Sequence, residues 1–331
     1  MKLIIQVPCW NEESSLPVTL RSLPSSVEGF DSVDVIVVDD GSSDRTREVA
    51  EAHGVEVVSV GYHQGLARTF MVGICACLER GADVIVNTDA DNQYSADDIP
   101  LIVEPILAGD ADLVVGSRPI ASIQHFSLIK KLLQVTGSYV VGRLSGTAVR
   151  DAPSGFRAIS RQAALSMNVF DPYTYTLETL IQAGQKGLRV RCVPIRVNKD
   201  LRPSRLVKSV PTYVLRSLKT IARMLIVYKP FRFFMYLGTT AFLLGVAIGI
   251  RFLFFYFTEG GDGRIQSLIL GSLLMTMGFQ TAMLAVIADL LSVNRRLIED
   301  VQRHQRDRSW GEGSGSPRRT ERFEHHDGSS T

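Results

Sequence analysis

Two aspartates, one residue apart, follow a short apolar run in the first third of the chain. The run Ile85-Val86-Asn87-Thr88 ends at Asp89-Ala90-Asp91. Alternate residues of an extended chain face the same side, so these two carboxylates can converge on one point. Close carboxylates repel each other unless a cation lies between them and a ligand, and Mg²⁺ or Mn²⁺ often shares such oxygen ligands with substrate phosphates. The triplet therefore predicts a metal–diphosphate site, and its alternative is a solvated acidic turn.

The composition narrows the class of protein. A chain of 331 residues with a formal net charge of +2 is too balanced to bind nucleic acid through overall charge, so we expect no nucleic-acid partner. The four cysteines have no zinc-binding spacing, which indicates reduced thiols in a cytosolic compartment. Met1-Lys2 leads directly into an apolar run, so no signal peptide is expected.

Apolar runs alternate with segments of helical period over the first two hundred residues. Strands are expected at residues 3–7, 34–38, 55–60, 83–88, 112–115 and 189–197. Helices are expected at residues 15–23, 45–53, 65–80, 97–107 and 173–186. This alternation predicts an α/β domain built on a mostly parallel sheet, with helices on both faces.

Polar residues follow three of these strands, at Asn11-Glu12, Asp39-Asp40 and Asp89-x-Asp91. In a parallel sheet these strand ends share one edge, outside which ligands bind. For Asp39 and Asp40 we expect one carboxylate to hold the turn at Gly41 and the other to bind a base or ribose hydroxyl. Three polar strand ends on one edge favour a binding site over a solubilising surface.

The last third of the chain is predicted to enter a membrane. Residues 233–257 and 265–291 are almost wholly apolar, and each exceeds the roughly 20 residues that cross a ~30 Å hydrocarbon core. Residues 206–232 mix Lys and Arg with apolar residues, as an interfacial helical segment does. Basic flanks place the preceding domain and both chain ends in the cytoplasm. Residues 292–331 are expected to be a cytoplasmic tail, disordered from about Gln305.

Taken together, six motifs resemble those of family 2 glycosyltransferases with a GT-A fold, and within that family the polyprenyl-phosphate glycosyltransferases, including dolichol-phosphate mannosyltransferases. The resemblance covers about residues 1–230, with the glycosyltransferase domain at 1–205. The motifs are Pro8-Cys9-Trp10-Asn11-Glu12-Glu13, Val38-Asp39-Asp40-Gly41-Ser42, Gly65-Leu66-Ala67, Asp89-Ala90-Asp91-Asn92-Gln93, Gly116-Ser117-Arg118 and Ser154-Gly155-Phe156-Arg157. Their order and spacing carry the likeness, since each is weak alone.

The resemblance implies a nucleotide-sugar donor, a divalent metal and a membrane polyprenyl phosphate as acceptor. We expect the donor to be a UDP- or GDP-sugar, the metal to be Mg²⁺ or Mn²⁺, and transfer to invert the anomeric carbon. The residues that it assigns to the nucleotide-sugar are Pro8, Trp10, Asn11, Glu12, Asp39, Asp40 and Asp89. Those assigned to the metal are Asp91 and Gln93, and the catalytic set is Asp89, Asp91, Arg118 and Arg157. The acceptor phosphate is expected at Arg118, Arg202, Ser204 and Arg205. An acceptor phosphate is already ionised at neutral pH, so it requires positioning by arginine more than deprotonation.

Some positions depart from the family pattern. Trp10 replaces the usual Tyr, Asn92 and Tyr94 replace an apolar residue and a His, and Arg202-Pro203-Ser204-Arg205 replaces a Gly-x-Ser-Lys segment. The alternatives are a sugar nucleotidyltransferase, a processive polysaccharide synthase, a glycosyltransferase for another membrane lipid, and a non-enzymatic membrane scaffold. The first should carry a Gly-rich loop, which Pro8–Glu13 lacks, and the second a Gln-x-x-Arg-Trp segment. The apolar helices could also mediate a homo-oligomer.

Overall fold

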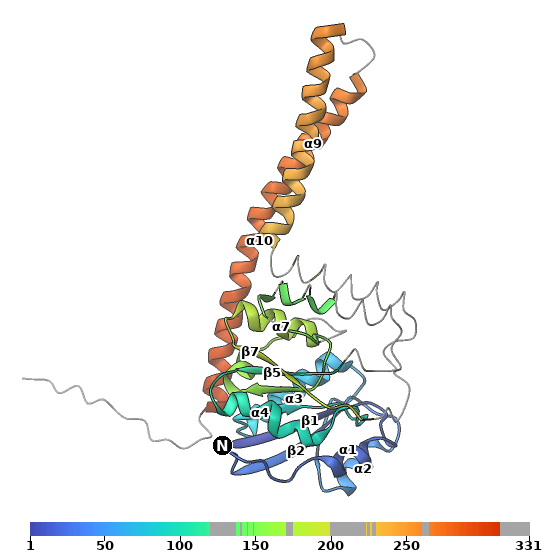
Figure 1. The fold of residues 1–331 in the computed structure, drawn as a ribbon, viewed down its shortest axis with the longest axis vertical. Coiled ribbons are helices and arrows are strands. Elements are labelled where there is room, and N and C mark those ends of the chain that lie inside the picture. The colour runs from blue at the N-terminus through green and yellow to red at the C-terminus, as the bar shows by residue number, and fades with distance from the viewer. Residues whose placement is uncertain are drawn as a thin grey trace, which may run out of the picture.

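The structure is a computed structural model in which an α/β domain carries a long helical hairpin (Figure 1). It describes residues 1–119, 137–139, 141–143, 145–147, 149–169, 175–198, 223, 226, 230–259 and 265–311. The expected interfacial segment at 206–232 lies almost entirely outside these residues.

The domain is built on a seven-stranded sheet in the order β3-β2-β1-β4-β6-β5-β7. The strands are β1 (Lys2–Cys9), β2 (Ser32–Asp39), β3 (Glu56–Ser59), β4 (Val84–Asn87), β5 (Leu113–Ser117), β6 (Arg157–Ser160) and β7 (Val190–Pro194). Strand β6 runs antiparallel to its neighbours β4 and β5, and all other pairs are parallel. The expected mostly parallel sheet is therefore confirmed.

Alternate residues of the central strands enter two separate cores, one on each face of the sheet. On β1, Ile4 belongs to one core, and Leu3 and Ile5 belong to the other. The helices are α1 (Leu16–Ser22), α2 (Thr46–Ala52), α3 (Leu66–Glu79), the short 3₁₀ helix η1 (Ala96–Asp98), α4 (Ile99–Leu107), α6 (Arg161–Ser166) and α7 (Thr176–Gln185). Helices α3, α6 and α7 pack on the first face, and α1 and α4 cover the second. Strands buried on both faces explain the apolar runs of the sequence.

Strand β6 was not predicted from the sequence. The sequence predicts a turn-rich segment at residues 151–157 that delivers one guanidinium, whereas Arg157 opens β6. The strand is only four residues long and inserts between β4 and β5, which are already close along the chain. Because β6 is antiparallel, its first residue lies at the same edge of the sheet as the last residues of β4 and β5. This reversal brings the segment before Arg157 into the candidate site.

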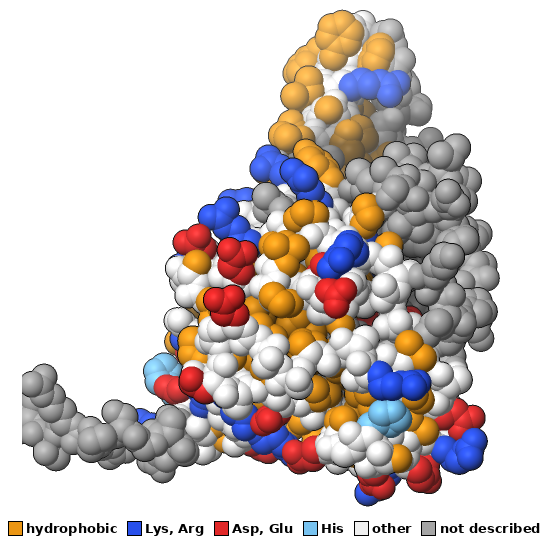
Figure 2. Space-filling view, turned by 60° about the horizontal axis from the view of Figure 1, so that its bottom comes forward, with side chains coloured by type: hydrophobic (Ala, Val, Ile, Leu, Met, Phe, Trp, Pro, Cys, Tyr) orange, Lys and Arg blue, Asp and Glu red, His pale blue; other side chains and the backbone are white. Residues whose placement is uncertain are grey.

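Helices α9 (Pro230–Glu259) and α10 (Ile265–Gly311) form an antiparallel hairpin, and both are long and apolar enough to cross a membrane. Glycines let the two backbones approach closely. A Cβ atom at Gly238 would lie 2.7 Å from the carbonyl oxygen of Gly278, and one at Gly245 would lie 2.7 Å from that of Gly271. Apolar side chains cover the outside of the projecting hairpin (Figure 2). Close backbone packing with an apolar exterior is typical of helices in lipid.

The expected tail requires a correction. Residues 292–311 continue α10 as a helix, so the disorder expected from about Gln305 is wrong up to Gly311. The reason is tertiary packing: Trp310 lies against the core under α6, and the Arg306 guanidinium donates to the Met167 carbonyl at 2.9 Å. The buried carboxylate of Glu299 pairs with Lys186 of the domain at 3.0 Å. One continuous helix thus joins the hairpin to the domain.

We expect Glu299→Ala to loosen this contact. The substitution leaves the partly buried Lys186 ammonium without its partner, which should cost about 2 kcal/mol; the cost is below that of a fully buried pair because Lys186 is part-exposed. Hydrogen exchange over residues 292–311 should accelerate, while exchange in β1 should not change. Asp300→Ala, at an exposed neighbouring position, is the matched control. Equal exchange in both variants would contradict the assignment.

Candidate active site

The carboxyl ends of β1, β2, β4 and β5 form one edge of the sheet, called the rim below. Register between β1 and its neighbours pairs Cys9 with Asp39 and Gln6 with Asn87. The three polar strand ends of the sequence therefore do share one edge, as expected. The antiparallel start of β6 adds Gly155 to the same place.

The loops after β1 and β2 are locked together at the rim. The Asn11 amide N–H donates to Ser42 Oγ at 2.9 Å, and the Ser43 N–H donates to Asn11 Oδ1 at 2.8 Å. The Glu12 N–H donates to Thr46 Oγ1 at 2.8 Å. Asn11 has a φ of 55°, in the left-handed region that asparagine tolerates better than most residues. The backbone turns sharply here, directly after Pro8 and Trp10.

The predicted nucleotide-binding carboxylates are buried where the loops after β1 and β2 meet. Glu12 accepts a hydrogen bond from Ser15 Oγ at 2.6 Å, and Asp39 accepts one from the Ser42 N–H at 3.0 Å. Asp40 accepts from the N–H groups of residues 64 and 65, at 2.8 and 2.9 Å. Both aspartates therefore accept hydrogen bonds from backbone N–H groups, whereas we expected only one of them to do so. Each carboxylate oxygen has a second lone pair, so these contacts leave capacity for a ligand.

His63 joins this group and was not predicted. Its Nδ1 lies 2.8 Å from Asp40 Oδ2, and its ring stacks on Trp10 with a centroid separation of 4.2 Å. Trp10 remains 41% exposed, so an aromatic surface faces solvent at the rim. A lone histidine in a loop gives no sequence signal, because its partner Asp40 lies more than twenty residues away along the chain.

Asp89 and Asp91 lie on the other half of the rim. Asp89 is pressed against the backbone: a Cβ atom at Gly155 would lie 2.9 Å from Asp89 Oδ1, so the contact requires glycine. Burial and the nearby Asp91 raise the pKa of the Asp89 carboxyl to about 7, against the opposing effects of Arg118 and a hydrogen bond with Tyr94. Asp91 Oδ1 accepts from the Gln93 N–H at 3.1 Å. The two carboxylates cannot both ionise here without a cost.

A divalent cation fits this donor set. Its positive charge would offset the desolvation of Asp89 and its repulsion by Asp91, and the Asp91 carboxylate and the Gln93 amide oxygen are hard ligands of the kind Mg²⁺ and Mn²⁺ bind. The described part of the chain has no group of three or more His, Cys, Asp or Glu side chains that could hold a metal ion. A cation here would therefore share its coordination with ligand oxygens and water, as Mg²⁺ does at substrate phosphates.

Arg118 reaches this half of the rim. Its guanidinium forms a bidentate pair with the fully buried Asp151, at 2.7 and 3.0 Å. Its Nη1 donates to Gln93 Oε1 at 3.2 Å. Arg118 thus orients the predicted metal ligand and brings positive charge next to it, and Asp151 was not predicted from the sequence.

Arg157 is not brought to the surface of the site. The side chain is fully buried, and its nitrogens donate to the carbonyls of Ser154 and Ala152, both at 2.9 Å, and to Thr179 Oγ1 at 2.5 Å. These bonds fix the loop that carries Gly155. Arg157 therefore supports the wall behind Asp89 from within the domain.

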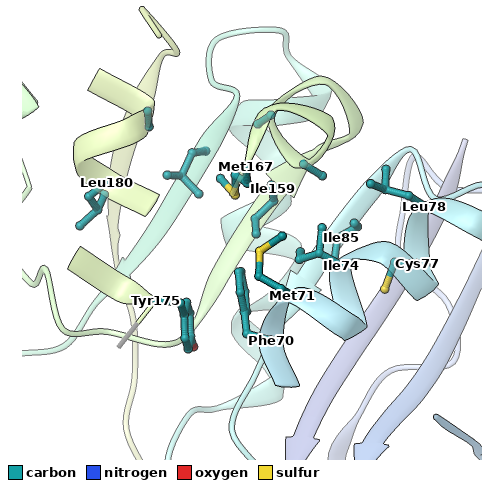
Figure 3. Close-up of a cluster of buried hydrophobic side chains, with 14 of the residues drawn as sticks. Phe70, Met71, Ile74, Cys77, Leu78, Ile85, Ile159, Met167, Tyr175 and Leu180 are labelled. Atoms are coloured by element: carbon teal, nitrogen blue, oxygen red, sulfur yellow. The ribbon is translucent and has the colours of Figure 1, made fainter. Parts of the chain in front are cut away.

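Tyr175, also not predicted, completes that wall. Its ring stacks on Phe70 with a centroid separation of 3.9 Å (Figure 3). The Asn87 side-chain amide donates to the Tyr175 hydroxyl at 3.0 Å and to the Gly155 carbonyl at 2.8 Å. Asn87 in turn accepts from Gln6 at 2.8 Å. The predicted acceptor residues Arg202, Ser204 and Arg205 lie outside the described residues.

Comparisons with known proteins agree with this geometry. Residues 4–165 match the model of glycosyl transferase family 2. The undecaprenyl-phosphate mannosyltransferase of Micrococcus luteus is 30% identical over 62% of this chain and 88% of its own. A UDP-N-acetylglucosamine–dolichyl-phosphate N-acetylglucosaminyltransferase of Methanococcus voltae is 29% identical over 57% of this chain and 83% of its own.

Solved structures show the same fold. The glucosyl-3-phosphoglycerate synthase of Mycobacterium tuberculosis, crystallised with Mn²⁺, UDP and glucosyl-3-phosphoglycerate, superposes with a TM-score of 0.51 at 22% identity. The match covers 66% of this chain and 79% of that one. The sheet, the motifs at its rim and the similarity to these relatives lead to one assignment: the chain belongs to glycosyl transferase family 2 and is a GT-A-type glycosyltransferase.

Proposed function

We propose that the protein transfers a sugar from a UDP- or GDP-sugar to a polyprenyl phosphate, with inversion at the anomeric carbon. One observation carries the proposal: the paired carboxylates Asp89 and Asp91 lie at the rim of a domain whose last helix continues into an apolar hairpin. The relatives named above act on undecaprenyl or dolichyl phosphate, which supports a lipid phosphate as the acceptor. Their sugars differ, so the donor sugar is left open.

Each half of the rim binds a different part of the donor. The aromatic surface of Trp10 and His63 offers a stacking face for the base, and the buried Asp40 carboxylate contacts the His63 ring. Asp89 lies beside Gly155, where a sugar or ribose hydroxyl could donate to its carboxylate. This placement leaves the diphosphate over Asp91 and Gln93.

The reaction needs stabilisation of the departing nucleoside diphosphate. A cation held by Asp91 and Gln93 would supply Lewis-acid stabilisation of that charge. Arg118 holds Gln93 in place and adds positive charge on the same side. Asp89 orients the donor, and Arg157 keeps the Ser154–Gly155 loop behind it rigid. Direct attack by the acceptor phosphate from the opposite face gives inversion.

The acceptor is proposed to meet the site at the membrane surface. Arg202, Ser204 and Arg205 precede the first apolar helix by about thirty residues and would bind the lipid phosphate together with Arg118. The basic flanks of the hairpin support a cytoplasmic position for the domain and for both chain ends. A different membrane lipid as acceptor is the second candidate, supported only by the apolar hairpin.

Asp91→Ala should abolish transfer. Loss of a metal ligand removes charge stabilisation worth several kcal/mol, so the initial rate should fall at least about a hundredfold. Transfer from a panel of UDP- and GDP-sugars to undecaprenyl phosphate, with Mn²⁺ or with EDTA, measures this. Asp97→Ala, an exposed carboxylate on the nearby η1, should keep its rate. Full activity of Asp91→Ala in EDTA would overturn the metal assignment.

Arg202→Ala should selectively weaken binding of the acceptor. We expect KM for undecaprenyl phosphate to rise at least about tenfold, because a charge-assisted contact to phosphate is lost, while donor binding and membrane attachment persist. Arg303→Ala on α10 serves as the control cation. Unchanged acceptor kinetics, or equal transfer to a neutral polyprenol, would refute a phosphate acceptor bound at Arg202.

The proposed topology predicts which positions an impermeant thiol reagent reaches. In sealed cells Gly261→Cys, between the two apolar helices, should be labelled at the outer surface. Ser314→Cys, in the C-terminal part, should be labelled only after permeabilisation. The reverse pattern would place the domain on the other side of the membrane.

A further inference from the structure

A cavity of about 410 Å³ lies where the hairpin meets the domain. Three helices surround it: Gln185 comes from the end of α7, Arg232 from the start of α9, and Asp289, Ser292 and Arg296 from α10. The three α10 residues are spaced i, i+3 and i+7, so they share one face of the helix. The proposed reaction uses none of these residues.

The wall of this cavity presents charged groups and a hydroxyl to a common space. The Ser292 residue lines the cavity and is only 8% exposed, whereas Arg232, Asp289 and Arg296 are exposed. Arg232 and Arg296 form no ion pair within the described part of the chain, and Asp289 is the one acid among the described lining residues. Two cations, one buried hydroxyl and one carboxylate therefore face a common space.

The cavity lies at the height of lipid headgroups if the hairpin spans a membrane, and the inference rests on that placement. Arg232 comes just before the apolar stretch of α9, and Arg296 comes just after that of α10. Lys and Arg side chains gather on the visible face where the hairpin meets the domain (Figure 2). Basic pockets between helices at this height bind phosphate-containing headgroups.

The cavity is separate from the candidate active site. Tyr175, beside Gly155, directly precedes α7, and Gln185 is the last residue of this ten-residue helix. The rise of an α-helix separates its two ends by about 15 Å. A ligand in the cavity would therefore contact the far end of α7 and leave the rim accessible.

We propose that this cavity binds the headgroup of a membrane phospholipid that carries both a phosphate and a primary ammonium group. The guanidinium groups of Arg232 and Arg296 suit phosphate because each offers a planar fork of donors. The Ser292 hydroxyl adds a further donor from the floor of the cavity. The Asp289 carboxylate accepts a hydrogen bond from the ammonium group. A headgroup without an amine would leave this carboxylate next to the phosphate with no cation of the lipid to balance it. The bound lipid would join α7 of the domain to both helices of the hairpin.

The test is native mass spectrometry on the delipidated full-length protein. Short-chain phosphatidylethanolamine, phosphatidylglycerol and diacylglycerol are titrated against the wild type, the double variant Arg232→Gln/Arg296→Gln, and Asp289→Asn. We expect the wild type to bind phosphatidylethanolamine several-fold more tightly than phosphatidylglycerol, and diacylglycerol only weakly. The double variant should lose at least about tenfold in affinity for both phospholipids, and Asp289→Asn should lose the preference for the amine. Arg308→Gln, an exposed cation further along α10, should behave as the wild type.

Two results would overturn the proposal. Equal binding by the double variant and the wild type would show that the arginines do not hold the phosphate. An unchanged preference for phosphatidylethanolamine in Asp289→Asn would show that the carboxylate does not select the amine. The Arg→Gln and Asp→Asn substitutions remove charge and keep polar side chains, and thermal unfolding of each variant tests whether the hairpin is intact.

Discussion

The desolvation of Asp89 beside a second carboxylate, Asp91, is the constraint on which the rest of the site depends. Desolvation and the charge of Asp91 together raise the pKa of the Asp89 carboxyl, which favours either a proton or a cation at this position. The chain maintains this arrangement with several devices: Gly155 allows the close approach, Arg157 fixes the Gly155 loop from behind, and Arg118 holds Gln93. Each of these residues contributes by keeping the carboxylates where a cation and a diphosphate can stabilise them.

The sequence predicted the parallel sheet and the shared rim because both follow from local patterns. Buried strands such as β1 and β4 read as apolar runs, and polar residues mark where each one ends. What it did not predict depends on contacts between distant segments. His63 has no signal apart from Asp40, and Tyr175 acts through Asn87, which is nearly ninety residues away. Arg157 was expected to help position the acceptor phosphate, but its side chain is fully buried at the start of β6.

In the C-terminal helix, contacts with distant residues produce order where the sequence predicted disorder. Its polar residues beyond Leu291 resemble a solvated tail, yet Glu299, Arg306 and Trp310 are held by the domain. Helical propensity and composition could not reveal these partners. The result is a direct mechanical link between the hairpin and the catalytic domain, which restricts how far the rim can move from the membrane surface. A glycosyltransferase with a lipid acceptor benefits from such a link because donor and acceptor must meet at the same distance from the membrane surface.

The paired carboxylates are proposed to hold a cation against a nucleoside diphosphate. A crystal or cryo-electron-microscopy sample with Mn²⁺ and either UDP or GDP tests it most directly, with anomalous scattering at the manganese edge where crystals are available. We expect one manganese ion bonded to Asp91 and to the diphosphate, with the base on the Trp10 and His63 surface. A nucleotide bound at the rim without metal, or manganese bound away from Asp91, would contradict it.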